Sequence, residues 1–450
     1  MYPAPFALER FFARHEFSAR YLLSASDCQG PGMAGLVAGA DPDLRRRWET
    51  LTLGYTESQG LPELREAIAA TYGGPGGAGA GAAAPGGNAG PSGGAAAGTA
   101  GPPTADQVLT AAPEELIFLA MHALLSPGDH VVCTFPGYQS LYELARSIGC
   151  EVDLWEPVET VGAGAVDAAG GAPGPGEAPS AVQGGAQRGG GAAGAPGWRF
   201  DPAHLEALLR PTTKLVVWNF PHNPTGALPA AADFARMVGA VARSGAWLFS
   251  DEMYRLLEPD AESRLPAAVD LYERALSLSG MSKAYGLAGL RIGWVATRDA
   301  ALLERMKALK DYTTICSAGP SEVLALMALR SPEPILAANR ARIARNAGIA
   351  GEFFERHRDT FRWVPPQAGT VCFPRLLDDG PGGQPEAADD RAAGRAGGAE
   401  AFCAAVLEGT GALLLPSTVY GYGDSLFRLG LGREDLAAGL AALDQFLSSR

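Results

Sequence analysis

The sequence lacks any apolar run of the roughly 18 residues that a membrane-spanning helix needs, and its N-terminus lacks the apolar core of a signal peptide. It also lacks an excess of positive charge. Across its 450 residues, 36 Lys and Arg stand against 49 Asp and Glu, which gives a formal net charge of −13. A chain of this balance offers no basic face, so we expect neither nucleic acid nor an anionic membrane as a partner.

Cysteine is scarce, and the spacing of metal ligands is missing. The six cysteines are scattered through mostly apolar stretches: Cys28, Cys133, Cys150, Cys316, Cys372 and Cys403. Such thiols are typical of buried side chains in a reducing compartment, so we expect a cytoplasmic protein without a metal site. One alternative is a transit peptide, because the stretch 8–15 is amphipathic and contains arginines. Its acidic residue and its direct continuation into the apolar stretch 21–23 favour the cytoplasm.

Large apolar side chains are nearly missing from three stretches, at about 74–104, 160–196 and 378–399, which consist mainly of Gly, Ala and Pro. Such stretches cannot offset their ordering entropy by burial, so we expect mobile surface loops, with a partner-binding arm as the alternative. The whole chain is 47% hydrophobic and 19% charged, as in soluble globular proteins. About 360 residues remain outside the three stretches, more than one core holds, which predicts two domains.

The most informative residue that is present is Lys283, which follows an apolar strand in a loop of small residues. An ordinary surface lysine fits this setting poorly. Partial burial among small and apolar groups lets a lysine amine lose its proton and attack an aldehyde. Arg291, eight residues further on, could hold an anion nearby. A nucleophilic amine beside a fixed cation suits pyridoxal phosphate, which carries both an aldehyde and a phosphate.

Polar side chains also follow two other predicted strands. The apolar run 214–220 leads into a Pro-rich turn that carries Asn223, and a second apolar run ends just before Asp251 and Tyr254. Taken singly, these residues also fit a plain turn and a helix N-cap. Because open α/β sheets bind ligands outside the carboxyl ends of their strands, we expect them to cluster with Lys283.

These motifs resemble those of the class I and II aminotransferases, the fold type I enzymes that depend on pyridoxal phosphate. The resemblance rests on His-Asn-Pro-Thr-Gly at 222–226, Asp-x-x-Tyr at 251–254 and Ser-Lys…Gly-Leu-Arg-Ile-Gly at 282–293. It covers nearly the whole chain apart from the three inserted stretches. It implies an α/β fold, with a mostly parallel sheet in a large cofactor-binding domain and a smaller α/β domain at the C-terminus. It also implies a homodimer.

The resemblance implies a role for each matched residue. Lys283 would form the Schiff base (internal aldimine) with the cofactor, and Asp251 would pair with the pyridine nitrogen. Arg428, together with Asn223, would bind the carboxylate of the substrate. The other cofactor contacts that it implies are the phenolic oxygen for Asn223 and Tyr254, the ring face for Tyr138, the phosphate for Ser282, Arg291, Ala111 and Ala112, and the phosphate of the neighbouring subunit for Tyr55.

The chemistry explains why such residues are needed. A carbanion forms when the α-proton of an amino acid is removed, and the cofactor ring accepts its electrons only while a carboxylate keeps the ring nitrogen protonated. Asp251 would supply that carboxylate. The freed amine of Lys283 would then move the proton as general base and acid. The planar guanidinium of Arg428 suits a carboxylate through two parallel hydrogen bonds, although a surface arginine beside a strand is the alternative.

Two positions depart from the family pattern. Pro113 stands at the start of the helix whose N-terminal amides would bind the phosphate, and proline has no N–H to donate. Gly280 stands where relatives often carry a Ser or Thr hydroxyl. Both changes predict looser retention of the cofactor.

Strand and helix patterns alternate through most of the chain. For the large domain they predict helices at 61–71, 114–125 and 139–148, and strands at 130–134, 151–155 and near 215, 246, 275 and 291, joined by right-handed crossovers. For the small domain they predict helices at 321–329 and 338–358, and strands at 370–373, 412–415 and 426–429. We therefore expect an N-terminal arm and part of the small domain at 1–50, the large domain at 51–310 and the small domain at 311–450.

The expected reaction is transfer of an amino group from an amino acid to a 2-oxo acid. A second cation is missing from the loop 312–317, so a neutral side chain is preferred over a dicarboxylic substrate. The chain is also similar to a bacterial branch that includes capreomycidine synthase, which keeps elimination, replacement or cyclisation open. A protein of another class, which binds ligand on this fold without turnover, remains an alternative, although it would have no need for this set of residues.

Overall fold

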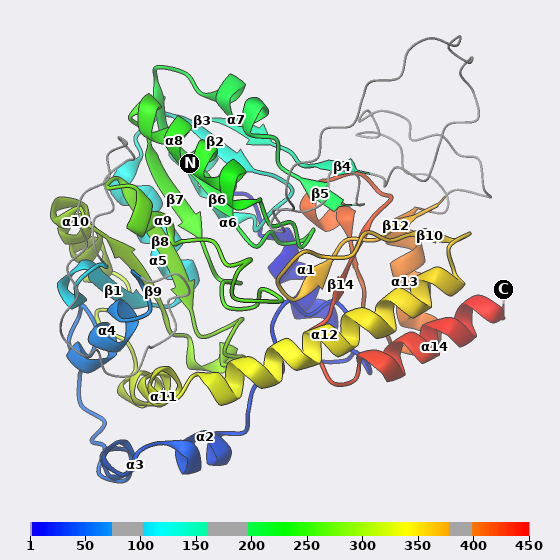
Figure 1. Ribbon diagram of the computed structural model, residues 1–450, viewed down its shortest axis with the longest axis horizontal. Helices are drawn as coiled ribbons and strands as arrows, with labels where there is room; N and C mark the ends of the chain where they lie inside the picture. Colours follow the sequence, from blue (N-terminus) through cyan, green and yellow to red (C-terminus); the bar gives the residue numbers. More distant parts are fainter. Residues whose placement is uncertain (1, 74–101, 161–196, 378–397, 450) are drawn as a thin grey trace, which may run out of the picture.

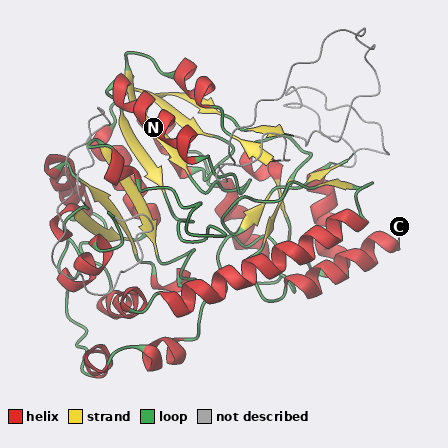
Figure 2. Ribbon diagram, viewed as in Figure 1, coloured by secondary structure: helices red, strands yellow, loops and turns green. Residues whose placement is uncertain are grey.

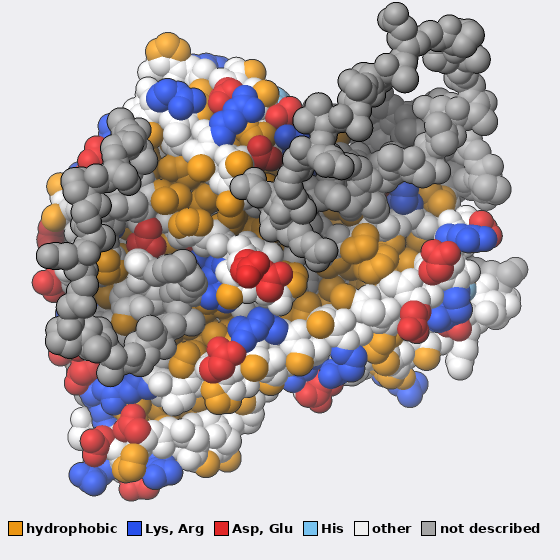
Figure 3. Space-filling model, in the orientation of Figure 1, with side chains coloured by type: hydrophobic (Ala, Val, Ile, Leu, Met, Phe, Trp, Pro, Cys, Tyr) orange, Lys and Arg blue, Asp and Glu red, His pale blue; other side chains and the backbone are white. Residues whose placement is uncertain are grey.

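The structure is a computed structural model that describes residues 2–73, 102–160, 197–377 and 398–449. Most of the length of the three Gly/Ala-rich stretches lies outside these residues. The prediction of mobile loops therefore concerns residues that the structure does not describe. Within the described residues, none of the helices combines the length and hydropathy needed to span a bilayer. On the face drawn in Figure 3, Lys and Arg side chains lie among Asp and Glu rather than gathering in one patch.

A seven-stranded sheet forms the centre of the large domain, with helices on both of its faces (Figures 1 and 2). Its spatial order is β1-β9-β8-β7-β6-β2-β3. The strands are β1 (Val108–Ala111), β2 (His130–Thr134), β3 (Glu151–Trp155), β6 (Thr213–Asn219), β7 (Trp247–Asp251), β8 (Ala275–Gly280) and β9 (Gly293–Thr297). The surrounding helices are α4 (Pro62–Ala69), α5 (Pro113–Leu124), α6 (Ser140–Ile148), α7 (Pro202–Leu208), α8 (Ala231–Ser244), α9 (Ala268–Leu271), α10 (Ala300–Lys310) and α11 (Gly319–Arg330), with 3-10 turns η1 (Ala105–Gln107) and η2 (Ala288–Leu290).

The mostly parallel sheet that the sequence predicted is confirmed, with one correction. β9 runs antiparallel to both of its neighbours, β8 and β1, instead of continuing the parallel crossovers. The loop between β8 and β9 carries only the 3-10 turn η2, whereas a parallel connection usually carries a full α-helix. The lysine loop, defined as residues 281–292, therefore joins two neighbouring strands and is anchored in the sheet at both ends.

The central strands of the sheet bury both of their faces, whereas the edge strand β3 is exposed or half-buried except at its last residue. Along β6, Leu215 and Val217 belong to one hydrophobic core, while Val216 and Trp218 belong to the core on the opposite face. Side chains alternate between the two faces of a strand, so a strand covered on both sides must be apolar at nearly every position. This explains the uninterrupted apolar runs in the sequence.

The small domain has a separate core built around Phe353, Phe361 and Phe427. Its helices are α12 (Glu333–Arg356), α13 (Ala399–Thr410) and α14 (Leu436–Ser448), and its strands are β10 (Phe361–Arg362), β11 (Val371–Cys372), β12 (Arg375–Leu376), β13 (Leu415–Pro416) and β14 (Phe427–Gly430), with the turn η3 (Ser417–Tyr420). The pair β4 (Val158–Thr160) and β5 (Gly197–Arg199) lies beside it (Figure 1). Residues of α11 belong to the core on one face of the large sheet, and the exact domain limits stay a prediction.

The N-terminal residues begin with α1 (Ala7–His15) and continue, after a connecting segment at 21–30, into α2 (Met33–Gly39) and α3 (Pro42–Glu49). The connecting segment is clamped between the two domains by backbone contacts. A Cβ atom on Gly30 would stand 1.9 Å from the Gly286 carbonyl oxygen in the lysine loop, and one on Gly430 of β14 would stand 1.9 Å from the Ala25 carbonyl oxygen. The segment also donates and accepts main-chain hydrogen bonds, including one from the Gly430 amide to the Leu23 carbonyl at 2.6 Å.

Gly280 ends β8 directly opposite Gly293 of β9. A Cβ on Gly280 would lie 2.9 Å from the Cα of Gly293, and one on Gly293 would lie 2.8 Å from the Pro113 ring. The close packing of the two strands on α5 therefore explains why this position lacks a side chain. The loss of a hydroxyl contact, which the sequence suggested, comes second to this steric demand.

We predict that Gly280→Ser destabilises the protein by about 1–3 kcal/mol, because overpacking forces the two strands apart. The measurement is the denaturant midpoint of the cofactor-free protein. Gly348→Ala on α12 is the control, since a Cβ there has open space around it and should stabilise the helix. A Gly280→Ser protein as stable as the wild type would contradict this steric explanation.

Candidate active site

A cavity of about 380 Å³ opens at the carboxyl ends of β6, β7 and β8. The sheet contributes Asn219 and Asp251, and the lysine loop contributes Lys283. The connecting segment at 21–30 closes one side, and α1 also lines the cavity. The cavity thus lies where the strand ends of an open α/β sheet leave a crevice, and its size suits a small cofactor with its substrate.

Asp251 is the last residue of β7 and is only 5% exposed. Among the described residues, the only hydrogen bond to its carboxylate comes from the Met253 amide, at 3.1 Å to Oδ1. Burial raises the pKa of Asp251 to about 7, and the nearby charge of Lys283 lowers it only in part. A buried carboxylate so poorly supplied with donors needs a cationic partner inside the cavity.

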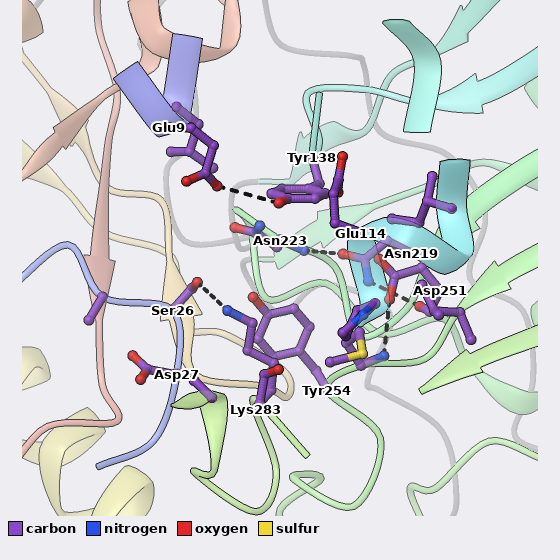
Figure 4. Close-up of a pocket in the computed structure, with 18 of the residues that line it drawn as sticks. Glu9, Ser26, Asp27, Glu114, Tyr138, Asn219, Asn223, Asp251, Tyr254 and Lys283 are labelled. Atoms are coloured by element: carbon purple, nitrogen blue, oxygen red, sulfur yellow. Dashed lines mark hydrogen bonds between the residues drawn. The ribbon is translucent and has the colours of Figure 1, made fainter. Parts of the chain in front are cut away.

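Lys283 points into the same cavity from the lysine loop (Figure 4). Its Nζ donates a hydrogen bond to Ser26 Oγ at 2.9 Å and lies 5.9 Å from the centre of the Tyr254 ring. Burial lowers the pKa of the Lys283 amine, while the charge of Asp27 opposes this shift. A lowered pKa increases the fraction of neutral amine, which is the nucleophilic form.

Asn223 and Tyr254 line the cavity next to Lys283, as the sequence predicted. Arg428 lies close by, yet it is not among the residues that line the cavity, and it is only 1% exposed. Its guanidinium donates to Asn223 Oδ1 at 3.1 Å, to the Tyr420 hydroxyl at 2.8 Å and to the Ser24 carbonyl at 2.7 Å. A substrate carboxylate that reaches Arg428 must therefore compete with Asn223 for these donors.

The phosphate end of the expected site is assembled in part. Ser282 and Arg291 both line the cavity, and Arg291 holds a left-handed backbone conformation with φ 55°. Tyr138 also lines it, and Figure 4 shows its ring in the cavity. At the start of α5, however, Pro113 and Glu114 line the cavity in place of the predicted Ala111 and Ala112. Ala111 belongs to β1 and Ala112 caps α5, so the chain reaches the cavity two residues later than the motif suggested.

Tyr55 lies outside the cavity and is 92% exposed. Within a single chain it therefore has no contact with the site. Other exposed large apolar side chains are Leu53, Tyr312 and Ile315.

Sequence reasoning missed the cavity residues that come from the N-terminus and from α5. These are Glu9, Glu16, Ser26, Asp27 and Glu114. The run of small residues at 24–26 is the one signal that could have indicated a tightly packed segment. No local motif distinguishes Glu9 or Glu16 from the charged residues of an ordinary surface helix.

The polar residues that line the cavity fit pyridoxal phosphate. Asp251 lacks a cationic partner that a protonated pyridine nitrogen would supply, and Lys283 offers an amine with a lowered pKa for the aldehyde. The remaining end of the cavity offers Arg291 and the Ser282 hydroxyl for an anion. Fold and site together define a fold type I enzyme that depends on pyridoxal phosphate.

Comparisons with known proteins support this assignment. The family model for "Aminotransferase class I and II" matches residues 192–442, so the chain belongs to this family of pyridoxal-phosphate-dependent transaminases. It is 28% identical over 336 residues to the aspartate/prephenate aminotransferase of Cereibacter sphaeroides. The matched region covers 72% of this chain and 70% of that protein. It is 29% identical over 343 residues to the capreomycidine synthase of Streptomyces vinaceus, covering 76% and 74%.

Two solved structures are also similar. One is a PLP-dependent aminotransferase from Streptococcus suis 89-1591, with a TM-score of 0.75 and 25% identity, covering 100% of this chain and 99% of that one. The other is the PLP-dependent cyclase OrfR, with a TM-score of 0.75 and 26% identity, covering 100% and 98%.

The buried Asp251 leads to a prediction for the cofactor-free protein. Its carboxyl ionises near pH 3.8 in ordinary surroundings but near pH 7 in the fold, so unfolding releases a proton between these values. The free energy of unfolding must therefore fall as pH rises through this window. Asp251→Asn removes the titration, so the variant should be more stable than the wild type at pH 8 and nearly equal to it at pH 4.

Denaturant unfolding at both pH values measures this difference. The exposed Glu352→Gln on α12 is the control and should shift stability equally at both. A difference between wild type and Asp251→Asn that does not change with pH would refute the raised pKa.

Proposed function

We propose that this cavity transfers the amino group of an amino acid to a 2-oxo acid, with Lys283, Asp251 and Tyr254 as its catalytic residues. The observation that carries the proposal is the presence, in one cavity, of a buried carboxylate without a cationic contact and a lysine of lowered pKa. Neither feature stabilises the cofactor-free protein. The carboxylate suits a protonated ring nitrogen, and the amine suits an aldehyde.

When bound, pyridoxal phosphate supplies an aldehyde for amines and a ring that takes up the electron pair left by the α-proton. Asp251 holds a proton on the ring nitrogen. Asn223 and Tyr254 hydrogen-bond the phenolic oxygen, Tyr138 packs on the ring, and Ser282 and Arg291 hold the phosphate. α5 adds its free N-terminal amides, fewer by one because Pro113 is the first residue of the helix.

The amine of Lys283 would remove the proton from Cα of the amino acid as general base and then donate it as general acid. Ser26 Oγ accepts a hydrogen bond from this amine and so fixes its position while it is free. Arg428 binds the α-carboxylate, with Asn223 as its neighbour. Its burial strengthens that contact, because charges attract more strongly in a medium of low dielectric.

A second reaction has a specific observation in its favour. The chain resembles capreomycidine synthase and the cyclase OrfR as closely as it resembles aminotransferases. Elimination or cyclisation differs from transamination only in where the electron pair goes after Cα is deprotonated. Binding without turnover is disfavoured, since Lys283 and Asp251 would then serve no purpose.

One screen separates these outcomes. Amino acids are added singly to the loaded protein, and the cofactor spectrum, 2-oxo acid formation and ammonia release are followed together. Transamination predicts a 2-oxo acid without ammonia, elimination predicts both, and cyclisation predicts neither with a product of altered mass. No spectral change with any amino acid would contradict the proposed function.

We predict that borohydride reduction of the loaded protein fixes the cofactor on Lys283, as peptide mapping would show. Lys283→Ala should keep no cofactor on this peptide and lose α-proton exchange by several orders of magnitude. Lys310, also buried, is the matched control, because its amine is held by the Ser58 and Ile315 carbonyls. A label on Lys310 or on another lysine would overturn the assignment.

We also propose that the enzyme is a cytoplasmic homodimer in which Tyr55 reaches the phosphate in the neighbouring subunit. Its 92% exposure in the single chain and the absence of disulfides among the six cysteines support this. Tyr55→Ala and Lys283→Ala chains, each impaired alone, should regain activity when refolded together, since one site of the mixed dimer is complete.

The test requires first that Tyr55→Ala is clearly impaired at limiting cofactor. The lost hydrogen bond to a charged phosphate is worth about 1.5–3 kcal/mol, which excess cofactor could mask. Mixtures no more active than the sum of the two variants, or a fully active monomer in sedimentation, would exclude a shared site.

A further inference from the structure

One face of α1 lines the cavity. Glu9, Phe12 and Glu16 follow each other at intervals of three and four residues and all three border the cavity. Residues at this spacing lie on the same side of a helix. The face therefore presents an aromatic ring between two carboxylates, with Glu16 at the C-terminal end of the helix.

Glu9 is exposed and Glu16 half-buried, and neither carboxylate has a cationic partner among the described residues. Glu9 accepts only a long hydrogen bond from the Tyr138 hydroxyl, at 3.4 Å, and Glu16 forms neither an ion pair nor a side-chain hydrogen bond. Burial and the charge of Asp27 raise the pKa of Glu16, so its ionised form is unfavourable in the empty cavity. A cation placed beside it would remove this penalty.

Of the other carboxylates around the cavity, Asp27 and Glu114 have partners, and the proposed function gives Asp251 to the cofactor. Asp27 forms an ion pair with Arg433 at 3.0 Å, and Glu114 accepts a hydrogen bond from Ser140 at 3.0 Å. Asp251 lies at the opposite side of the cavity from Glu9 and Asp27 (Figure 4). The cations that line the cavity are Lys283 and Arg291, and the proposed function assigns both to the cofactor.

The face of α1 lies beside the position proposed for the substrate carboxylate. The Phe12 ring centre is 5.8 Å from Cζ of Arg428. An amino acid whose carboxylate reaches Arg428 and whose Cα lies beside Lys283 must pass its side chain along this face. The side chain then meets Phe12 and, at either end, a carboxylate.

We propose that Glu9, Phe12 and Glu16 select an amino acid whose side chain ends in a cation, an ammonium or a guanidinium group. This rests on the proposed function and deepens it, and it replaces the neutral side chain that the sequence favoured. The apolar stem of such a side chain packs beside Phe12, whose ring already carries the Arg428 guanidinium, and the terminal cation donates to a carboxylate. A neutral side chain would leave both carboxylates without a cationic partner, and an acidic one would meet like charges.

The test compares substrates of equal shape that differ in charge: arginine with citrulline, and ornithine with norleucine. The loaded wild-type enzyme should show a kcat/KM at least about tenfold higher for the cationic member of one pair, the range of a hydrogen bond to a charged group. Glu9→Gln and Glu16→Gln should lower that value by about tenfold to hundredfold and leave the neutral member within about twofold. Glu408→Gln, an exposed residue of α13 outside the cavity, is the control of equal charge change.

Binding is measured separately from turnover. 2-Methylornithine and 2-methylnorleucine have no α-proton and side chains of equal length, so calorimetric titration into the loaded enzyme reports recognition of the charge alone. Tighter binding of 2-methylornithine that is lost in both glutamine variants supports the proposal. Equal preference for neutral and cationic amino acids overturns it and leaves transamination standing. If no amino acid reacts at all, the proposed function fails, and the two methyl analogues still decide between charge recognition and its absence.

Discussion

The active cavity depends on the packing of the segment 21–30 between the two domains. Gly30 touches the carbonyl of Gly286 in the lysine loop, and Gly430 of the small domain touches the carbonyl of Ala25. Side chains at either glycine would push the backbones apart. The contact therefore sets the distance between the domains, and it brings Ser26 within hydrogen-bond distance of Lys283.

In the cofactor-free protein, the ionisable groups of the pocket lower the stability of the fold. Asp251 is buried with one amide donor, and Lys283 is half-buried with one hydroxyl acceptor. Each group would be better solvated in the unfolded chain, so each costs free energy until a ligand supplies the missing charge. Occupation of the pocket by the cofactor thus restores stability that the residues of the site removed.

The sequence predicted much of the sheet and its strand ends, because β2, β6 and β7 contain continuous apolar runs of the length of buried strands. Asn223, Asp251 and Lys283 were placed correctly for the same reason, since each follows such a run. β1 and the antiparallel direction of β9 were missed, because neither strand pairing nor direction is encoded in local periodicity. Glu9 and Ser26 were missed because contacts across more than a hundred residues leave no trace in spacing. The cavity is lined by Pro113 and Glu114 rather than by Ala111 and Ala112, a shift at the start of α5 that the motif did not predict.

The lysine loop is tied to the sheet at both ends, while α1 belongs to a separate stretch of chain before the connecting segment. Bond-making chemistry and recognition of the side chain are therefore carried by different pieces of the polypeptide. Such modularity lets one piece change without disturbing the other. Exchange of α1 for the corresponding helix of a relative offers a direct way to redirect the substrate range of this scaffold, with the reactive lysine left in place.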